Sequence, residues 1–248
     1  MDVDVKRFVE KHYGMSVSGF EPLEGYGSEN YRVCTDSGTY VLKFYKPEQE
    51  RFQKELLETE DKVFQRLSSI ENLSFPFPQE DQSGKSILYS KALNRYFRLL
   101  RFVEGELFVN VEHTPELYYS LGKAMAEMDK ELLGFKSIAA EARQSIWDLQ
   151  FPGLNRENLK LIENPADRKF VEYFYLQNSE RVAPKLEQLR KTVIHGDVND
   201  WNIAVVDGRV AGIFDFGDIT YSPLINELAI AATYAVMDKA DPVKWVLP

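Results

Sequence analysis

The stretch that decides the fold is VIHGDVNDWNI, residues 193–203, which is followed by FDFGD at residues 214–218. Short apolar runs flank both segments, a pattern typical of strands that end in polar loops. Between positions 195 and 230 there is one basic residue, and there are six acidic ones: Asp197, Asp200, Asp207, Asp215, Asp218 and Glu227. Carboxylates gathered beside apolar strands repel one another unless a cation neutralises them. The pattern therefore predicts a cation site in this part of the chain.

A divalent ion such as Mg²⁺ fits this pattern, because it takes carboxylate and amide oxygens and keeps other positions for water and phosphate. Asn202 and Asp215 have these donor atoms and stand at the ends of adjacent predicted strands. Asp197 lies in the loop before Asn202, where its carboxylate is free to orient a substrate hydroxyl. Taken singly, His-Gly-Asp and Asp-Phe-Gly are more often turns whose aspartate caps a strand. Their order and spacing together favour a site.

Two strands are predicted upstream, at residues 30–35 and 39–44, with a tight turn between them. Alternation along the second strand places Lys43 among apolar neighbours, where it can meet an anion. The following helix, expected to reach Leu67, carries Glu60 on its apolar stripe. We interpret Lys43 and Glu60 as partners; the alternative is a lysine whose ammonium reaches solvent and a solvated glutamate.

The segment GYGSEN, residues 25–30, comes just before these strands. Its glycines allow backbone N–H groups to approach a phosphate closely. It matches neither the P-loop, which ends in Gly-Lys-Ser/Thr before a helix, nor GxGxxG. It therefore points to a phosphate site only in combination with the lysine.

Residues 104–248 are predicted to be mainly helical, whereas residues 1–103 are rich in strands. The expected fold is α+β in two lobes, an N-terminal lobe with an antiparallel sheet and a C-terminal helical lobe, with a hinge near residues 101–106. The C-terminal lobe also holds the polar loops described above. Its longest helices are expected at residues 115–133, 168–189 and 225–237.

The charge of the chain is uneven along its 248 residues, whose formal net charge is −9. Residues 1–103 hold 15 basic and 16 acidic side chains (−1), and residues 104–248 hold 15 and 23 (−8). This acidity argues against a nucleic-acid-binding protein. The single cysteine, Cys34, excludes a disulfide within the chain, and no apolar run is long enough for a membrane span. We expect a cytoplasmic protein with neither nucleic acid nor membrane as a partner.

HGDVNDWN followed by IFDFGD resembles the catalytic and metal-binding motifs of the aminoglycoside phosphotransferase and choline kinase superfamily, a branch of the protein-kinase-like fold. The longer string that continues to ITYSPLINELAIAATYA, together with IWDL at residues 146–149, is similar to the hydroxylysine kinase-like branch. The resemblance extends from about Leu23 to Asp241.

This resemblance implies a role for each candidate residue. Asp197 would be the catalytic carboxylate that orients or deprotonates the acceptor hydroxyl. Asn202 and Asp215 would hold Mg²⁺ between the nucleotide phosphates. Lys43, fixed by Glu60, would contact the α- and β-phosphates.

The resemblance also implies where the nucleotide lies. Ser28 and Asn30 would belong to the loop that covers it. The backbone around Phe102 and Val103 would meet the adenine or guanine ring, so that ATP or GTP is the phosphate donor. His195 would support the catalytic loop.

The function expected from these observations is a Mg²⁺-dependent kinase that phosphorylates the hydroxyl of a small, cationic metabolite. Hydroxylysine leads among the acceptors, with choline, ethanolamine, homoserine and an aminoglycoside as rivals. Only 33 residues follow Asp215 (248 − 215), which is short for this family. The alternative is therefore an impaired, truncated kinase-like protein that binds nucleotide and acts through partners. A protein kinase is disfavoured because HRD and APE segments are absent from the sequence. The oligomeric state is left open.

Overall fold

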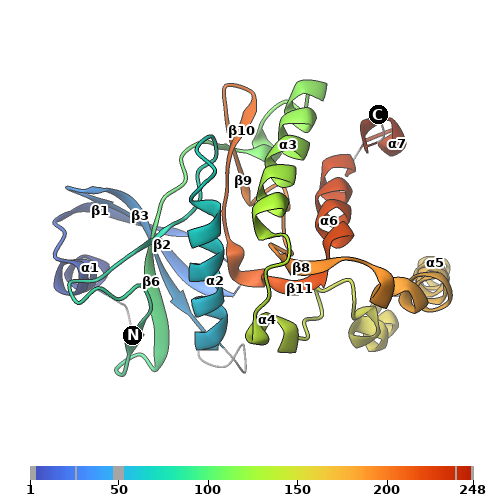
Figure 1. Ribbon diagram of the computed structural model, residues 1–248, viewed down its shortest axis with the longest axis horizontal. Coiled ribbons are helices and arrows are strands. Elements are labelled where there is room, and N and C mark those ends of the chain that lie inside the picture. The colour runs from blue at the N-terminus through green and yellow to red at the C-terminus, as the bar shows by residue number, and fades with distance from the viewer. Residues whose placement is uncertain (1–3, 26, 47–52, 238, 247–248) are drawn as a thin grey trace. The chain divides into compact units, whose positions relative to one another are not determined.

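The computed structural model describes residues 4–25, 27–46, 53–237 and 239–246. The chain divides into two compact units (Figure 1). The first consists of Met1–Glu112 and Trp201–Asp215, and the second of His113–Asp200 and Phe216–Pro248. The predicted α+β class with an antiparallel sheet is confirmed.

A six-stranded antiparallel sheet forms the body of the first unit, in the order β1-β2-β3-β6-β4, with β5 paired to β6. The hairpin predicted at residues 30–44 is β2 and β3 of this sheet. The strands are β1 (Val17–Leu23), β2 (Ser28–Thr35), β3 (Gly38–Tyr45), β4 (Pro78–Gln79), β5 (Leu88–Ser90) and β6 (Arg95–Arg101).

The two helices of the first unit face opposite sides of this sheet (Figure 1). Helix α1 (Val5–Tyr13) packs with Leu42 and Phe44, which point to one face of β3. Helix α2 (Gln53–Leu67) brings its buried residues to the other face, the face of Lys43. The first residues of the predicted second helix, 47–52, lie outside the described part of the chain.

A smaller sheet, in the order β10-β9-β7, completes the first unit. It consists of β7 (Glu106–Leu107), β9 (Ile203–Val206) and β10 (Arg209–Ile213). Because β7 pairs with β9, and because Ser74 bridges to β10, the hairpin 201–215 groups with the N-terminal residues. The two units thus differ from the lobes predicted at 1–103 and 104–248. The first boundary between the units, after Glu112, lies near the predicted boundary after residue 103.

The second unit is mainly helical, with one two-stranded antiparallel ladder between β8 and β11. The predicted helices at 115–133 and 225–237 are confirmed as α3 and α6. The predicted helix at 168–189 begins earlier, at Pro165, and continues beyond Gln177 as a π turn and a 3₁₀ segment. Its helices are α3 (Pro115–Leu132), α4 (Ile138–Ala142), α5 (Pro165–Gln177), α6 (Leu224–Val236) and α7 (Pro242–Val246), and its strands are β8 (Lys191–Ile194) and β11 (Thr220–Pro223). It also has 3₁₀ segments at Pro152–Leu161, Ala183–Gln188 and Phe216–Asp218. A further 3₁₀ segment, Phe108–Asn110, belongs to the first unit.

No helix in the described part of the chain is both long and apolar enough to cross a membrane.

Candidate active site

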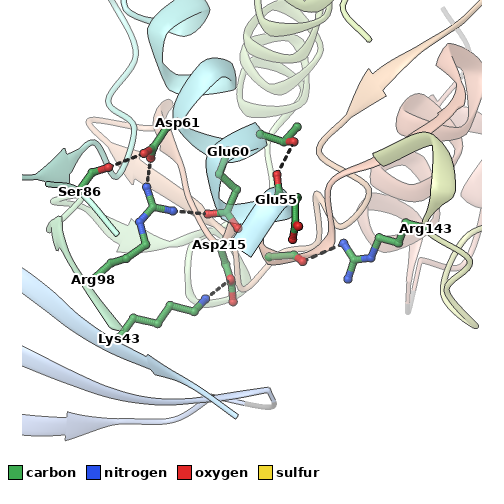
Figure 2. Close-up of polar contacts among 10 residues, drawn as sticks. Lys43, Glu55, Glu60, Asp61, Ser86, Arg98, Arg143 and Asp215 are labelled. Carbon is green, nitrogen blue, oxygen red and sulfur yellow. Dashed lines mark hydrogen bonds and ion pairs between the residues drawn. The ribbon is translucent and has the colours of Figure 1, made fainter. Parts of the chain in front are cut away.

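Lys43 and Asp215 form an ion pair in the first unit, with 2.6 Å between Lys43 Nζ and Asp215 Oδ1 (Figure 2). Lys43 is buried on β3, on the face opposite to Leu42, as the alternation along the strand predicted. Asp215 follows β10 and has a φ of 60°. A non-glycine residue in the left-handed region is uncommon and is often found at functional sites. The structure thus brings two of the predicted site residues into direct contact.

The environment of Lys43 favours its charged form. Burial acts to lower the pKa of this ammonium, but the negative charge of Asp215 and the nearby Tyr45 and Glu60 outweigh burial and hold the pKa above its usual value. Lys43 is therefore a permanently charged cation, which is the form that would contact a phosphate.

Asn202 lies at the same end of the β9–β10 hairpin as Asp215. Ile203 of β9 pairs with Ile213 of β10, and the Phe214 N–H donates to the Asn202 carbonyl over 3.0 Å. Asn202 is buried, whereas 45% of the Asp215 side chain is exposed. The prediction that these two residues end adjacent strands is confirmed.

Glu60 is buried on α2, as predicted, but its partner is not the predicted one. Its Oε2 accepts from Arg98 Nη1 over 2.9 Å, and Lys43 pairs with Asp215 instead (Figure 2). The predicted Lys43–Glu60 ion pair is therefore wrong for this structure. The reason is the sheet register, which sets Arg98 of β6 directly opposite Lys43 of β3 and gives Glu60 a second cation to bind.

The protonation of Glu60 is balanced between opposing influences. Burial raises the pKa of this carboxyl to about 7, against the attraction of Arg98 and Lys43, which act to lower it. Its charge is therefore sensitive to changes in either cation.

Ser28 and Asn30 belong to β2 rather than to a loop, which corrects their predicted placement. Asn30 pairs with Lys43 across β2 and β3, so both side chains point to the same face of the sheet. Asn30 Oδ1 is buried and has no hydrogen-bond partner among the described residues. The Asn30 amide lies close to Gly25, so a side chain at position 25 would have to displace it.

Phe102 and Val103 follow β6 directly. The Phe102 N–H donates to the Thr39 carbonyl over 3.1 Å, and Arg32 lies over the Phe102 ring. Val103 is buried, and a Cβ at Gly212 would lie 2.4 Å from its Cγ1. The segment is thus hydrogen-bonded to β3, and Val103 lies close to Gly212 of β10.

Asp197 belongs to the second unit, in the loop after β8. Its Oδ1 accepts from Asn199 Nδ2 over 2.9 Å, and its N–H donates to His195 Nδ1 over 3.2 Å. His195 is fully buried and its ring packs against Phe216 at 4.4 Å between centroids. The imidazole thus accepts a hydrogen bond from the backbone of this loop.

Sequence reasoning missed three buried polar residues, Arg98 in the first unit and Glu227 and Arg143 in the second. Arg98 is described above. Glu227 of α6 is fully buried and accepts from the Gly196 N–H over 3.3 Å. Arg143 donates to the carbonyls of Gly217 and Ile219, both over 2.9 Å. A lone acid in the apolar helix LINELAIAATYAV was a usable signal for Glu227; an arginine at position 143 carries none.

The donor chemistry of the first unit suits a hard divalent ion. In the described part of the chain no group of three or more His, Cys, Asp or Glu side chains could hold a metal. The two candidate donors from the sequence, the Asp215 carboxylate and the Asn202 amide, would be the protein's contribution to such a site. Such a sparse set fits Mg²⁺, which completes its shell with water and phosphate oxygens.

Comparison with known proteins identifies the family of the chain. Residues 19–244 match the family model described as "Phosphotransferase enzyme family". Hydroxylysine kinase of Xenopus laevis is 29% identical over 96% of this chain and 70% of its own length. Hydroxylysine kinase of Mus musculus is 28% identical over 98% of this chain and 71% of its own length.

Solved structures support the fold. An amicoumacin kinase in complex with AMP-PNP, Ca²⁺ and its ligand has a TM-score of 0.71 at 19% identity, covering 99% of this chain and 72% of that one. A microcompartment-associated aminopropanol kinase has a TM-score of 0.67 at 16% identity, covering 98% and 78%. The family match and the hydroxylysine kinases confirm the resemblance inferred from HGDVNDWN and IFDFGD: the chain belongs to the phosphotransferase enzyme family and is a small-molecule kinase that uses an alcohol group as acceptor.

Proposed function

We propose that this protein is a Mg²⁺-dependent kinase that moves the γ-phosphate of ATP or GTP to the hydroxyl of hydroxylysine or a similar cationic amino alcohol. The observation that carries the proposal is the Lys43–Asp215 ion pair, with Asn202 at the same end of the β9–β10 hairpin. A fixed cation beside a carboxylate and an amide is the combination that phosphoryl transfer requires, because the reaction depends on positioning and on neutralising charge.

The nucleotide would bind at the face of the sheet that carries Lys43. Lys43 would contact the phosphates, and Asn30, with its unpartnered Oδ1, would accept a hydrogen bond from the nucleotide. The segment at Phe102 and Val103 would contact the base. Asp215 and Asn202 would hold Mg²⁺, which supplies positive charge to the phosphates when it is bound.

Two observations support a cationic acceptor. Residues 104–248 have a net charge of −8 (15 − 23), which attracts cations by simple Coulomb interaction. The hydroxylysine kinases that this chain matches act, by name, on an amino acid with a hydroxyl and two amino groups. Asp197 would orient and deprotonate the hydroxyl of this acceptor.

A phosphorylation assay with a panel of acceptors tests the proposal. Hydroxylysine, ethanolamine, choline, homoserine and an aminoglycoside are each offered with ATP and with GTP, in the presence of Mg²⁺. We expect transfer to hydroxylysine or to another amino alcohol, and loss of at least about a hundredfold in kcat for Asp197→Asn.

Asp207→Asn is the matched control, because it also removes one carboxylate but lies at the exposed turn of the β9–β10 hairpin. It should keep the activity of the parent protein. Nucleotide binding without transfer to any acceptor would favour a kinase-like protein that acts through partners. An Asp197→Asn variant as active as the parent would exclude the role given to Asp197.

A further inference from the structure

Arg98 is a buried arginine that joins the sheet to helix α2. Its guanidinium donates to Glu60 over 2.9 Å and to Asp61, the next residue on the helix (Figure 2). Its side chain is 0% exposed. Asp61 in turn accepts from Ser86 Oγ. An arginine without any contact with water is rare unless its charge is paired. Two carboxylates from one helix therefore hold this cation.

Arg98 also stands directly beside Lys43. The two residues pair across β3 and β6, so their side chains point to the same face of the sheet. Lys43 binds Asp215 and Arg98 binds Glu60. Adjacent buried cations repel each other, and each of them needs a carboxylate of its own.

A nucleotide phosphate changes this balance. Lys43 binds Asp215 in this structure, and its ammonium has three N–H donors, so a phosphate that binds it shares Lys43 with that carboxylate or takes its place. Glu60 is a second carboxylate whose charge acts on Lys43. Glu60 can turn toward Lys43 without leaving Arg98 unpaired, because Asp61 remains as the second partner of the guanidinium.

We propose that Arg98 is a positioning residue for nucleotide binding: it holds Glu60 beside Lys43, and its second bond to Asp61 lets Glu60 be shared with Lys43. This inference rests on the proposed function, because it assumes that Lys43 binds the nucleotide phosphates. Arg98 itself touches neither nucleotide nor acceptor.

The test compares variants in the full chain by nucleotide affinity, measured by titration calorimetry, and by the separate KM values for nucleotide and acceptor. Arg98→Met should weaken nucleotide binding by about 10- to 100-fold, as for residues that orient a ligand-binding side chain, and leave the acceptor KM within about twofold. Arg98→Lys keeps one cation but cannot bind both carboxylates in the same way, so its nucleotide affinity should fall between those of Arg98→Met and the parent.

Two controls separate positioning from general damage to the sheet. Arg95 lies on the same strand and pairs with Glu29 over 2.7 Å, but it packs over Phe44, on the opposite face from Lys43. Arg95→Met should leave nucleotide affinity unchanged. Asp61 contacts Arg98. Asp61→Asn should lower the melting temperature, and it should weaken nucleotide binding less than Arg98→Met does.

Wild-type nucleotide affinity in folded Arg98→Met would overturn the proposal, and so would an equal loss in Arg95→Met. If Arg98→Met does not fold, Arg98→Lys decides in the same way, and parental affinity in that variant overturns the proposal. A parent protein that binds nucleotide but transfers no phosphate removes the proposed function alone. A parent protein that binds no nucleotide removes both.

Discussion

Lys43 and Asp215 lie 172 positions apart in the sequence and are joined by a 2.6 Å ion pair. The contact ties the third strand of the large sheet to the end of the β9–β10 hairpin. It also means that the carboxylate proposed to hold a metal already holds a cation. Lys43 and a divalent ion therefore compete for Asp215, whereas Lys43 and a nucleotide phosphate attract each other.

Lys43→Met should separate these two effects. Without the ammonium, nucleotide should bind about 10- to 100-fold more weakly, the loss expected for a charge-assisted hydrogen bond. Mn²⁺ alone should bind more tightly, by about two- to fivefold, because a half-exposed ion pair contributes up to about 1 kcal/mol. Calorimetric titrations of the same protein with each ligand make the comparison.

Asp215→Asn removes the other member of the ion pair, and its effect on Mn²⁺ binding should be the opposite of that of Lys43→Met. It should lose Mn²⁺ binding, and asparagine tolerates the left-handed backbone found at this position. Asp207→Asn, also at a left-handed position of the same hairpin, should bind Mn²⁺ as the parent does. Weaker Mn²⁺ binding in Lys43→Met would contradict the competition between lysine and metal.

Gly212 should not accept a side chain. A Cβ at this position would lie 2.4 Å from Val103 Cγ1 and 2.7 Å from the Ser74 carbonyl oxygen, and the backbone atom cannot rotate away. We expect Gly212→Ala to reduce the free energy of unfolding by about 1–3 kcal/mol, the usual effect of overpacking. Gly122→Ala is the control: no atom lies within 4 Å of its added Cβ in α3, and alanine should stabilise the helix by about 0.5–1 kcal/mol. Urea denaturation of both variants measures the difference.

Local patterns were sufficient to predict where Lys43, Glu60, Asn202 and Asp215 lie within their own elements. Alternation gave the face of Lys43, helical spacing gave the burial of Glu60, and the apolar runs gave the hairpin that ends at Asn202. The partner of Glu60 could not be predicted in this way, because it depends on which residue of β6 stands opposite Lys43. A shift of one residue in that register would turn Arg98 to the other face.

The IWDL segment, residues 146–149, is a second case in which the sequence could not predict a residue's partners. The segment supported the resemblance to a family but indicated no structural role for Asp148. In the structure Asp148 is buried and accepts hydrogen bonds from the hydroxyls of Thr220 and Ser222, over 2.9 and 3.1 Å, and from Gln150. Strand β11, which was not predicted, is thus held by a carboxylate 72 residues upstream of Thr220.

Asp148→Ala should therefore destabilise the second unit. The variant leaves two buried hydroxyls without their acceptor, at a cost of about 1–3 kcal/mol for each group left unsatisfied. Thermal unfolding should show a melting temperature lower by several degrees, about 2–4 °C for each kcal/mol in a chain of this size. Glu141→Ala, at an exposed position of α4, should melt with the parent. An unchanged melting temperature in Asp148→Ala would show that water replaces the carboxylate without cost.

Glu227 should make the stability of the protein depend on pH. Burial, together with the nearby charges of Asp129 and Asp197, raises the pKa of this carboxyl to about 8, against the N–H groups of Gly196 and His195, which act to lower it. The folded protein therefore keeps a proton that the unfolded chain releases near its ordinary value of 4.5. Because the folded state binds more protons between these two values, its stability should fall as the pH rises from about 5 to 8.

Glu227→Gln removes this titration while an amide oxygen remains to accept the Gly196 N–H. The variant should lose less stability between pH 5 and pH 8 than the parent, by up to about 1.4 kcal/mol per pH unit. Asp129, whose pKa burial raises to about 7, leaves a smaller slope of the same sign in the variant. Glu116→Gln, at an exposed position near the start of α3, should keep the slope of the parent. Equal slopes for Glu227→Gln and the parent across this range would mean that Glu227 is ionised in the folded protein, with its charge offset by the N–H groups of Gly196 and His195.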